Sequence, residues 1–322
     1  MNPTIKKRLE QLPEAPGIYK MLDASGRIIY IGKSKCLKKR VHSYFVPNPK
    51  WDKARRMSGY ICDIQTIVTD THLEAMLLEC ELIKKIRPCF NTLMKNDGRY
   101  SYLTLEENFR KKPLKLTLTR DGCSFGPFRS RGKVQTAMDL LVNLYPLSGN
   151  EHKFDLEYHV FPYVMNREEF DENRRVLNAL FSDADIMAAF RMAVSGQMLN
   201  AAAETHFERA KRYKDLNDAM AYIQNALLRY KSWTHNGLVY GVRLPEGYKL
   251  FLIADGQIRT SVKVADFSDE VKKDFILDCE KKGMLKNVQS QDEGLDEKGM
   301  VDYMDIIYGE LSEADPEMIF LL

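Results

Sequence analysis

The chain has 322 residues, of which 44% are hydrophobic and 29% are charged, and its formal net charge is +3. These values are typical of a folded globular protein and exclude collagen-like, low-complexity and wholly disordered chains. No run approaches the roughly 18 uninterrupted apolar residues of a membrane-spanning helix, and no apolar signal segment follows the basic N-terminus. The six cysteines form no CxxC pair. The sequence therefore predicts reduced thiols, a cytoplasmic location and no membrane association.

The charges are distributed unevenly. Residues 1–134 contain 27 Lys or Arg and 13 Asp or Glu, a net charge of +14, whereas residues 135–322 have a net charge of −11. A basic segment of this kind attracts polyanions through phosphate contacts and counterion release. A solvated basic surface without a ligand is the ordinary alternative. The combination of a basic half with an acidic half favours nucleic-acid binding by the N-terminal half.

The first 90 residues predict a compact β–β–α–β–α unit. Two strand-like runs flank a Gly-containing turn, which indicates a hairpin, and a basic helical pattern follows. A third strand precedes Asp70 and Thr71, which can cap a helix that must end before Pro88. The expected ranges are 17–21 and 27–32 for the hairpin, 33–44 for the basic helix, 63–69 for the third strand and 72–87 for the last helix.

The rest of the chain predicts a helical middle region and a β-rich end, so the fold class is α+β. A strand at 114–119 and a turn-rich stretch at 125–128 precede a helix at 135–145, and residues 168–230 have mostly helical patterns. Strands follow at 238–244, 248–254 and 257–264, the last two as a hairpin across Asp255 and Gly256, and a loop is expected at 287–300. We expect four segments, with bounds 1–95, 96–165, 166–232 and 233–322.

Glu79 is the first candidate site residue, because its carboxylate falls on an apolar side of the predicted helix 72–87. At 100° per residue it lies among Ala75, Met76, Ile83 and Ile86. A carboxylate there costs several kcal/mol unless a cation or hydrogen-bond donors compensate it. A structural ion pair is the ordinary explanation. A metal ligand at the rim of a cleft is the functional alternative.

The hairpin and the basic stretch after it supply further candidates. Tyr19 and Tyr30 occupy comparable places on the two strands, although aromatic residues favour strands for packing alone. On helical spacing, several basic side chains would project to one side and hold a phosphate. These are Lys33, Lys35, Lys38, Lys39 and Arg40, with His42 beside them.

The order of these motifs resembles the signature of the GIY-YIG nucleases. Gly17-Ile18-Tyr19 and Tyr30-Ile31-Gly32 are followed by the family's other positions, Arg40, Tyr44, Glu79 and Asn91. The runs LLECELIKKIRPCFN at 77–91 and FGPF at 125–128 are similar to the UvrC type of this family. The likeness is dense over residues 12–147. It implies a GIY-YIG domain with a small three-stranded antiparallel sheet flanked by helices in residues 1–95, and a UvrC-like extension after it.

The resemblance also implies a function and a set of roles. It indicates an endonuclease of nucleotide excision repair that nicks one strand of damaged double-stranded DNA, on the 3′ side of the lesion. Tyr30 would be the general base, Arg40 would contact the scissile phosphate, and Glu79 would hold one Mg²⁺ or Mn²⁺. Tyr19, Tyr44 and Asn91 would orient water and substrate, and Lys33 would favour the Tyr30 phenolate. Lys35, Lys38, Lys39 and His42 would bind DNA.

The resemblance is weaker in the second half. Residues 207–215 look like a diverged UVR motif, the helical hairpin through which UvrC-type proteins contact a UvrB-like partner, and the length resembles the short UvrC homologue Cho. No cysteine lies between Cys123 and Cys279, where UvrC proteins usually carry a cluster. Two other functions stay open: a stand-alone GIY-YIG nuclease, against which the 77–91 run argues, and a catalytically idle adaptor for DNA or UvrB, against which the retained Glu79 argues.

Overall fold

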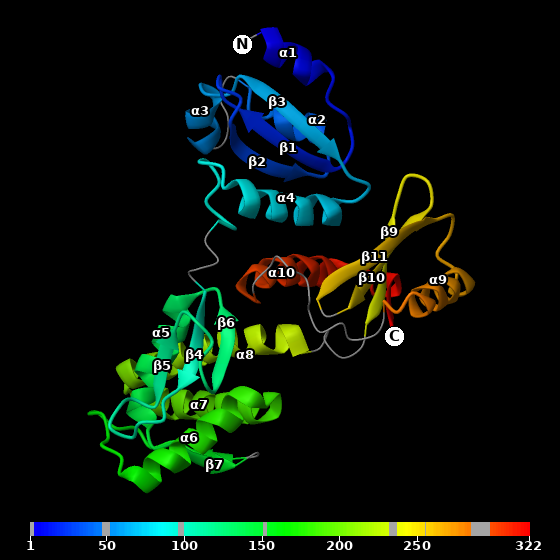
Figure 1. The fold of residues 1–322 in the computed structure, drawn as a ribbon. Helices are drawn as coiled ribbons and strands as arrows, with labels where there is room; N and C mark the ends of the chain where they lie inside the picture. Colours follow the sequence, from blue (N-terminus) through cyan, green and yellow to red (C-terminus); the bar gives the residue numbers. More distant parts are fainter. Residues whose placement is uncertain are drawn as a thin grey trace. The chain divides into compact units, whose positions relative to one another are not determined.

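The computed structural model describes residues 3–46, 52–95, 100–150, 153–231, 237–254, 256–284 and 297–322. The chain forms two compact units, one made of residues 1–97 with 233–322 and the other of residues 98–232 (Figure 1). The predicted α+β class is confirmed: a three-stranded antiparallel sheet, a helical middle region and a four-stranded C-terminal sheet follow one another. The four expected segments stay a prediction, and their boundaries near residues 96 and 232 fall outside the described residues.

The N-terminal sheet contains β1 (Gly17–Leu22), β2 (Ile28–Ser34) and β3 (Asp63–Val68) in the order β2-β1-β3, with both pairings antiparallel. These are the three strands that the sequence predicts. Three short helices surround them: α1 (Pro3–Glu10), α2 (Leu37–His42) and α3 (Asp52–Ser58). The prediction missed α1 and α3, each of only two turns, because so few residues give little periodic signal.

Helix α4 (His72–Ile86) begins and ends where local chemistry dictates. The Thr71 hydroxyl accepts from the Glu74 N–H at 3.2 Å, and the Glu74 carboxylate accepts from the Thr71 N–H at 3.0 Å. This reciprocal capping box satisfies two N–H groups that the first turn leaves free. Arg87 adopts a left-handed conformation (φ 51°) and ends the helix before Pro88, which cannot continue it.

Helix α4 is packed on two sides. Ala75 and Ile83 join Ile18 and Ile31 of the N-terminal sheet in one hydrophobic cluster. A second cluster joins Leu73, Met76 and Leu77 to side chains of the C-terminal segment, which include Leu238, Phe251 and Ile307. Met76 lies on the same side of α4 as Ile83 but packs against the second cluster, because the C-terminal segment covers the helix next to the sheet.

The C-terminal segment forms a four-stranded sheet with two helices. Strands β9 (Leu238–Arg243), β10 (Tyr248–Ala254), β11 (Gln257–Val264) and β12 (Ile319–Leu321) lie in the order β11-β10-β9-β12. The helices are α9 (Asp269–Lys281) and α10 (Glu297–Glu313), and a 3₁₀ turn (Pro316–Met318) precedes β12. The predicted β10–β11 hairpin is confirmed, although Asp255 lies outside the described residues. The predicted loop at 287–300 is wrong for 297–300, which begin α10; its other residues are not described.

The second unit combines a small sheet with helices. Strands β4 (Ser101–Leu105), β5 (Leu114–Thr117) and β6 (Ser124–Phe128) lie in the order β5-β4-β6, and β7 (Ser148–Asn150) pairs with β8 (Lys153–Asp155). The turn expected at 125–128 is wrong, because Phe125 and Ser124 complete a strand against β4. The helices are α5 (Arg131–Leu141), a 3₁₀ turn (Val142–Leu144), α6 (Arg167–Ser182), α7 (Ala184–Ala203) and α8 (Phe207–Lys231).

No helix in the described part of the chain is long and apolar enough to cross a membrane.

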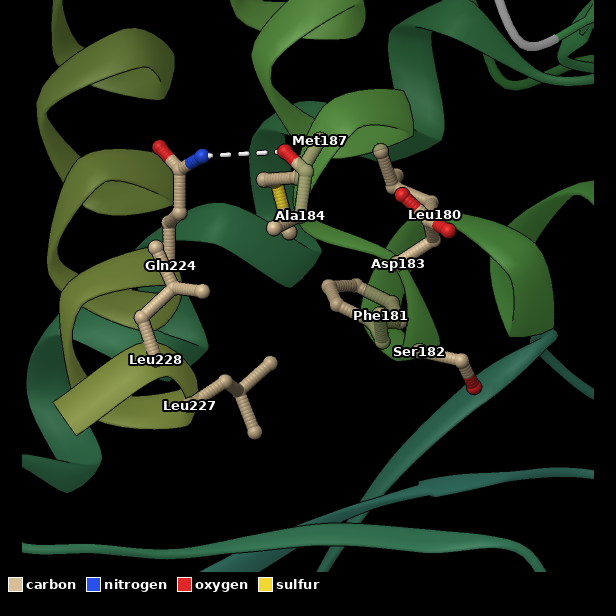
Figure 2. Close-up of a pocket in the computed structure, with 9 residues that line it drawn as sticks. All are labelled: Leu180, Phe181, Ser182, Asp183, Ala184, Met187, Gln224, Leu227 and Leu228. Carbon is tan, nitrogen blue, oxygen red and sulfur yellow. Dashed lines mark hydrogen bonds between the residues drawn. The ribbon is translucent and has the colours of Figure 1, made fainter. Parts of the chain in front are cut away.

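A pocket lies between α8 and the junction of α6 and α7, and Figure 2 shows its lining. Most of the lining is apolar, and its polar groups are already engaged. Asp183 caps α7, and Gln224 donates to the Ala184 carbonyl at 3.3 Å (Figure 2). We therefore assign this pocket a packing role and look for the functional site elsewhere.

Candidate active site

The β1–β2 register places the two tyrosines of the hairpin on one face. Tyr19 pairs with Gly32, and Met21 pairs with Tyr30. Because cross-strand partners share a face and side chains alternate along a strand, Tyr19, Gly32 and Tyr30 project to the same side. A Cβ at Gly32 would meet the hydroxyl of Tyr19 and would lie 3.0 Å from its Cε1. The glycine therefore leaves the space that the Tyr19 ring occupies.

Three tyrosines form a cluster on this face. The ring centroid of Tyr19 lies 6.1 Å from that of Tyr30 and 5.8 Å from that of Tyr44, which follows α2. The hydroxyls of Tyr19 and Tyr44 are hydrogen-bonded at 2.7 Å, and the Arg40 guanidinium lies 5.3 Å from the Tyr44 ring. Burial raises the pKa of Tyr19, and the neighbouring hydroxyls raise that pKa further. Tyr19 is thus a neutral phenol with a fixed positive charge, the Arg40 guanidinium, nearby.

Glu79 faces this cluster from α4. Its Oε1 accepts a hydrogen bond from the Lys33 N–H at 3.1 Å, directly after Gly32 on β2. Burial raises the pKa of the carboxyl, whereas the Lys33 charge and N–H, and the Arg40 charge, act in the opposite direction. Among the described residues nothing donates a hydrogen bond to Oε2. A backbone N–H and two cations therefore offset the cost of burying the Glu79 carboxylate. Its second oxygen stays available to a ligand.

Burial and neighbouring charges also shift the pKa values of Tyr30 and Lys33. Burial raises the pKa of Tyr30, and the Tyr44 hydroxyl and Glu79 charge raise it further, against Arg40. Burial lowers the pKa of the Lys33 ammonium, and Glu79 opposes this shift. Burial thus outweighs the nearby cations at Tyr30, and the expected role of Lys33 in favouring the phenolate stays a prediction.

Asn91 lies beside the edge strand β2 and hydrogen-bonds to its backbone. Its side-chain NH₂ donates to the Ile31 carbonyl at 2.9 Å, and its side-chain oxygen accepts from the Ile31 N–H at 3.0 Å. Asn91 therefore fixes the strand between Tyr30 and Gly32. Its expected role in orienting water and substrate stays a prediction, and the geometry adds a positioning role.

The expected DNA-binding residues lie on the chain that leads into and through α2. Lys35, Lys39 and His42 are exposed. Lys38 pairs with Glu14 at 2.9 Å, and the His42 Nε2 lies 3.2 Å from the Leu9 carbonyl. The structure thus leaves Lys35 and Lys39 accessible to a phosphate, while Lys38 has an acidic neighbour. Their DNA contacts stay a prediction.

Sequence reasoning missed Lys53 of α3. Its Nζ lies 4.9 Å from the centroid of the Tyr30 ring, which brings a third cation to the cluster. Burial lowers the pKa of Lys53, and Lys95 and Arg56 lower it further. The basic run of α3 was a visible signal in the sequence. No spacing rule connects it with Tyr30, because α3 reaches the cluster only through the fold.

The site therefore brings six of the expected residues together: Tyr19, Tyr30, Lys33, Arg40, Tyr44 and Glu79. No group of three His, Cys, Asp or Glu side chains with metal-binding geometry occurs within the described ranges. A single carboxylate with an available oxygen suits a hard cation that keeps most of its water ligands.

The comparisons agree with this geometry. The model of the UvrC-like GIY-YIG domain matches residues 15–92, which include every residue of the cluster. Residues 15–92 are therefore similar to a UvrC-like GIY-YIG domain. Within the domain, β1 carries the GIY motif, β2 the YIG motif and α4 the glutamate.

Curated relatives extend the similarity beyond the domain. UvrABC system protein C of Desulfitobacterium hafniense is 35% identical over 223 residues, which are 66% of this chain and 36% of the relative. The protein of the same name from Christiangramia forsetii is 32% identical over 270 residues, 76% of this chain and 44% of the relative. The matched part of this chain thus spans about two-fifths of these relatives.

A solved structure is similar to the GIY-YIG domain alone. It is the GIY-YIG N-terminal endonuclease domain of UvrC from Thermotoga maritima, bound to its catalytic divalent cation, magnesium. The two sequences are 40% identical, the match covers 29% of this chain and 100% of that one, and the TM-score is 0.27.

Proposed function

We propose that this chain is a metal-dependent DNA endonuclease of nucleotide excision repair. The observation that carries the proposal is the Glu79 carboxylate, which has one oxygen on the Lys33 N–H and the other available, next to Tyr30 and Arg40. The similarity to the UvrC-like GIY-YIG domain and to UvrABC system protein C supports the same activity. An adaptor has no need of a half-buried carboxylate aimed at a cluster of tyrosines and cations.

Glu79 is the residue that would hold one Mg²⁺ or Mn²⁺. The donor fits, because hard cations take carboxylate oxygens and Mg²⁺ is commonly bound through one or two carboxylates with several waters. The similar Thermotoga maritima domain is described with magnesium as its catalytic cation. Such an ion supplies charge neutralisation on the phosphate and stabilises the leaving oxygen.

The side chains of the cluster have distinct roles in the proposal. Arg40 offers a planar guanidinium, which can make two parallel hydrogen bonds to the scissile phosphate. Tyr30 is the proposed general base. Its raised pKa keeps it a phenol in this structure, so its oxygen first accepts a hydrogen bond from the attacking water and orients it. Only the phenolate can accept the proton of this water, so Tyr30 must first release its own proton to solvent. Nearby cations favour the phenolate, and Arg40 and Lys53 supply two.

The substrate and partner of the whole reaction are also proposals. We infer that the substrate is damaged double-stranded DNA, that the cut lies on the 3′ side of the lesion, and that the reaction takes place in the cytoplasm, where free cysteines such as Cys36 and Cys89 are stable. Residues 207–215 form the first turns of α8, and Phe207 is 69% exposed there. An exposed aromatic side chain at a helix start supports the proposed contact with a UvrB-like protein.

The experiment measures nicking of a duplex with one bulky lesion, in Mg²⁺, with and without UvrB. Wild type is compared with Glu79→Gln and Tyr30→Phe. Glu81→Gln is the matched control, because Glu81 lies on the same helix but is exposed. We expect Glu79→Gln and Tyr30→Phe to lose at least a hundredfold in rate while DNA affinity in EDTA changes less than threefold, and Glu81→Gln to nick normally.

Each outcome separates the functions. A nick at one position of the damaged strand, dependent on UvrB and lost in Glu79→Gln, supports excision repair. Cutting without a lesion and without UvrB would indicate a stand-alone nuclease instead of an excision-repair enzyme. Equal rates for wild type and Glu79→Gln would refute the assigned site, and DNA binding without any cutting would leave the adaptor.

A further inference from the structure

The turn between β4 and β5 of the second unit carries a cluster of positive charge. We call residues 107–112, Glu-Asn-Phe-Arg-Lys-Lys, the basic tip. It is an ordered turn: the Lys111 N–H donates to the Asn108 carbonyl at 2.9 Å, and the Arg110 N–H donates to Asn108 Oδ1 at 3.0 Å. Because these bonds fix the backbone, the side chains project from a defined position on the hairpin.

The acidic side chains at the tip are engaged by other partners. The Glu106 carboxylate accepts from the N–H groups of Glu107 and Asn108, at 3.0 and 3.2 Å, and lies 3.9 Å from Lys111. Glu107 pairs with Arg174 of α6 at 3.3 Å. Within the described ranges, Arg110 and Lys112 have no acidic partner. Both are exposed, so their charges are available to an anion.

An aromatic ring lies among these cations. Phe109 is 39% exposed, and the Arg110 guanidinium carbon lies 5.7 Å from its ring centroid. Cations that contact phosphates and an aromatic ring that packs on a base or a sugar are the usual combination in proteins that bind nucleic acids. An isolated solvated lysine run has no need of the ring.

The surroundings of the tip have the same charge. Residues 99–133 contain nine Lys or Arg and three Asp or Glu. Several of the other basic side chains are exposed, namely Arg120, Arg129, Arg131 and Lys133. A surface with this balance attracts DNA by counterion release before any specific contact forms.

We propose that the basic tip is a second DNA-binding element, outside the GIY-YIG domain. Arg110 and Lys112 contact backbone phosphates, and Phe109 packs against a base or a deoxyribose. This proposal rests on the proposed function for its ligand, DNA, but it assigns no step of the cleavage reaction to the tip.

The test measures DNA affinity by fluorescence anisotropy at several salt concentrations, in EDTA so that nothing is cut. The variant Arg110→Gln/Lys112→Gln removes two charges from the tip. Each lost phosphate contact reduces the slope of log K against log salt by about 0.9, so we expect a slope lower by about 2 and an affinity loss of roughly eightfold per contact at 0.1 M salt. The control Lys273→Gln/Lys281→Gln removes the same charge from exposed positions of α9.

Phe109→Ala separates the ring from the charges. It should weaken binding by roughly 5- to 100-fold, the range of one base-stacking contact, without changing the salt slope. Thermal melting of each variant checks that it is folded. A salt slope for Arg110→Gln/Lys112→Gln equal to that of the control would overturn the proposal. It would also be overturned if this variant kept its DNA affinity and lost only its binding to a partner protein.

The two proposals fail in different ways. If the tip variant loses salt slope but wild type never nicks DNA, the endonuclease is refuted and the tip stands. If wild type nicks lesion DNA through Glu79 and the tip variant keeps its full slope, the tip is refuted and the endonuclease stands.

Discussion

The ion pair between Lys84 and Asp302 gives the sharpest test of how the two ends of the chain are joined. Lys84 Nζ lies 2.7 Å from Asp302 Oδ2, and the side chains are only 9% and 2% exposed. The pair connects α4 with α10, 218 residues apart in the chain. We therefore expect Asp302→Ala to leave the Lys84 ammonium buried without the carboxylate that lies against it.

The expected loss is large. Removing one partner of a buried pair costs about 3–5 kcal/mol, because the remaining charge keeps its desolvation penalty. Folded domains have a total stability of about 5–15 kcal/mol, so this is a substantial part of it. The double variant Lys84→Met/Asp302→Leu removes both charges of this pair, and we expect a stability within about 1 kcal/mol of wild type or above it.

Urea unfolding measures these differences as free energies of unfolding. The control is Asp278→Ala, which breaks the pair of Lys282 and Asp278, 2.6 Å apart but 56% and 55% exposed. An exposed pair contributes less than about 1 kcal/mol. If Asp302→Ala costs no more than this control, the reasoning is refuted, because the ammonium would then be solvated rather than enclosed between α4 and α10.

Two further predictions concern the N-terminal sheet and α4. Gly32→Ala should cost about 1–3 kcal/mol by forcing Tyr19 aside, whereas the exposed Gly59→Ala, whose Cβ would meet nothing, should be near neutral in the same urea assay. Burial and nearby lysine charges lower the pKa of His72 to about 4, below the roughly 6.5 of an unfolded chain. The unfolded state therefore binds this proton first, so stability should fall as the pH drops from 6.5 to 4, and His72→Gln should lose less between pH 7.5 and 5. Equal losses in both proteins would contradict it.

Local signals made much of the N-terminal domain predictable. Thr71 and Pro88 delimit α4 because a cap and a helix breaker act over a few residues, and Gly26 marks the β1–β2 turn with a positive φ of 77°. The site residues were predictable only as a resemblance. Alternation on strands places Tyr19 and Tyr30 on one face, but it does not say what else that face meets.

What the sequence could not predict depends on contacts between distant segments. Lys53 reaches Tyr30 through the position of α3, and the C-terminal segment joins the N-terminal domain in one unit across the whole intervening chain. The stretch at 125–128 was read as a turn because of Gly126 and Pro127. It forms β6 at the edge of its sheet, where a proline's missing N–H leaves no pairing position unfilled.

The packing of α4 supports the proposal that Glu79 is a metal ligand. Periodicity counts one apolar face, whereas this helix buries Ala75 and Ile83 against the N-terminal sheet and Leu73 against the C-terminal segment. A helix held on two sides cannot rotate to bring a carboxylate into solvent. The Glu79 carboxylate therefore stays at the Lys33 N–H, where burial raises its pKa, and a cation is the partner that offsets this cost. If so, loosening the C-terminal contact, as in Asp302→Ala, should weaken Mg²⁺ binding, so that nicking needs a higher Mg²⁺ concentration. This is expected even though Asp302 lies on a different helix from Glu79.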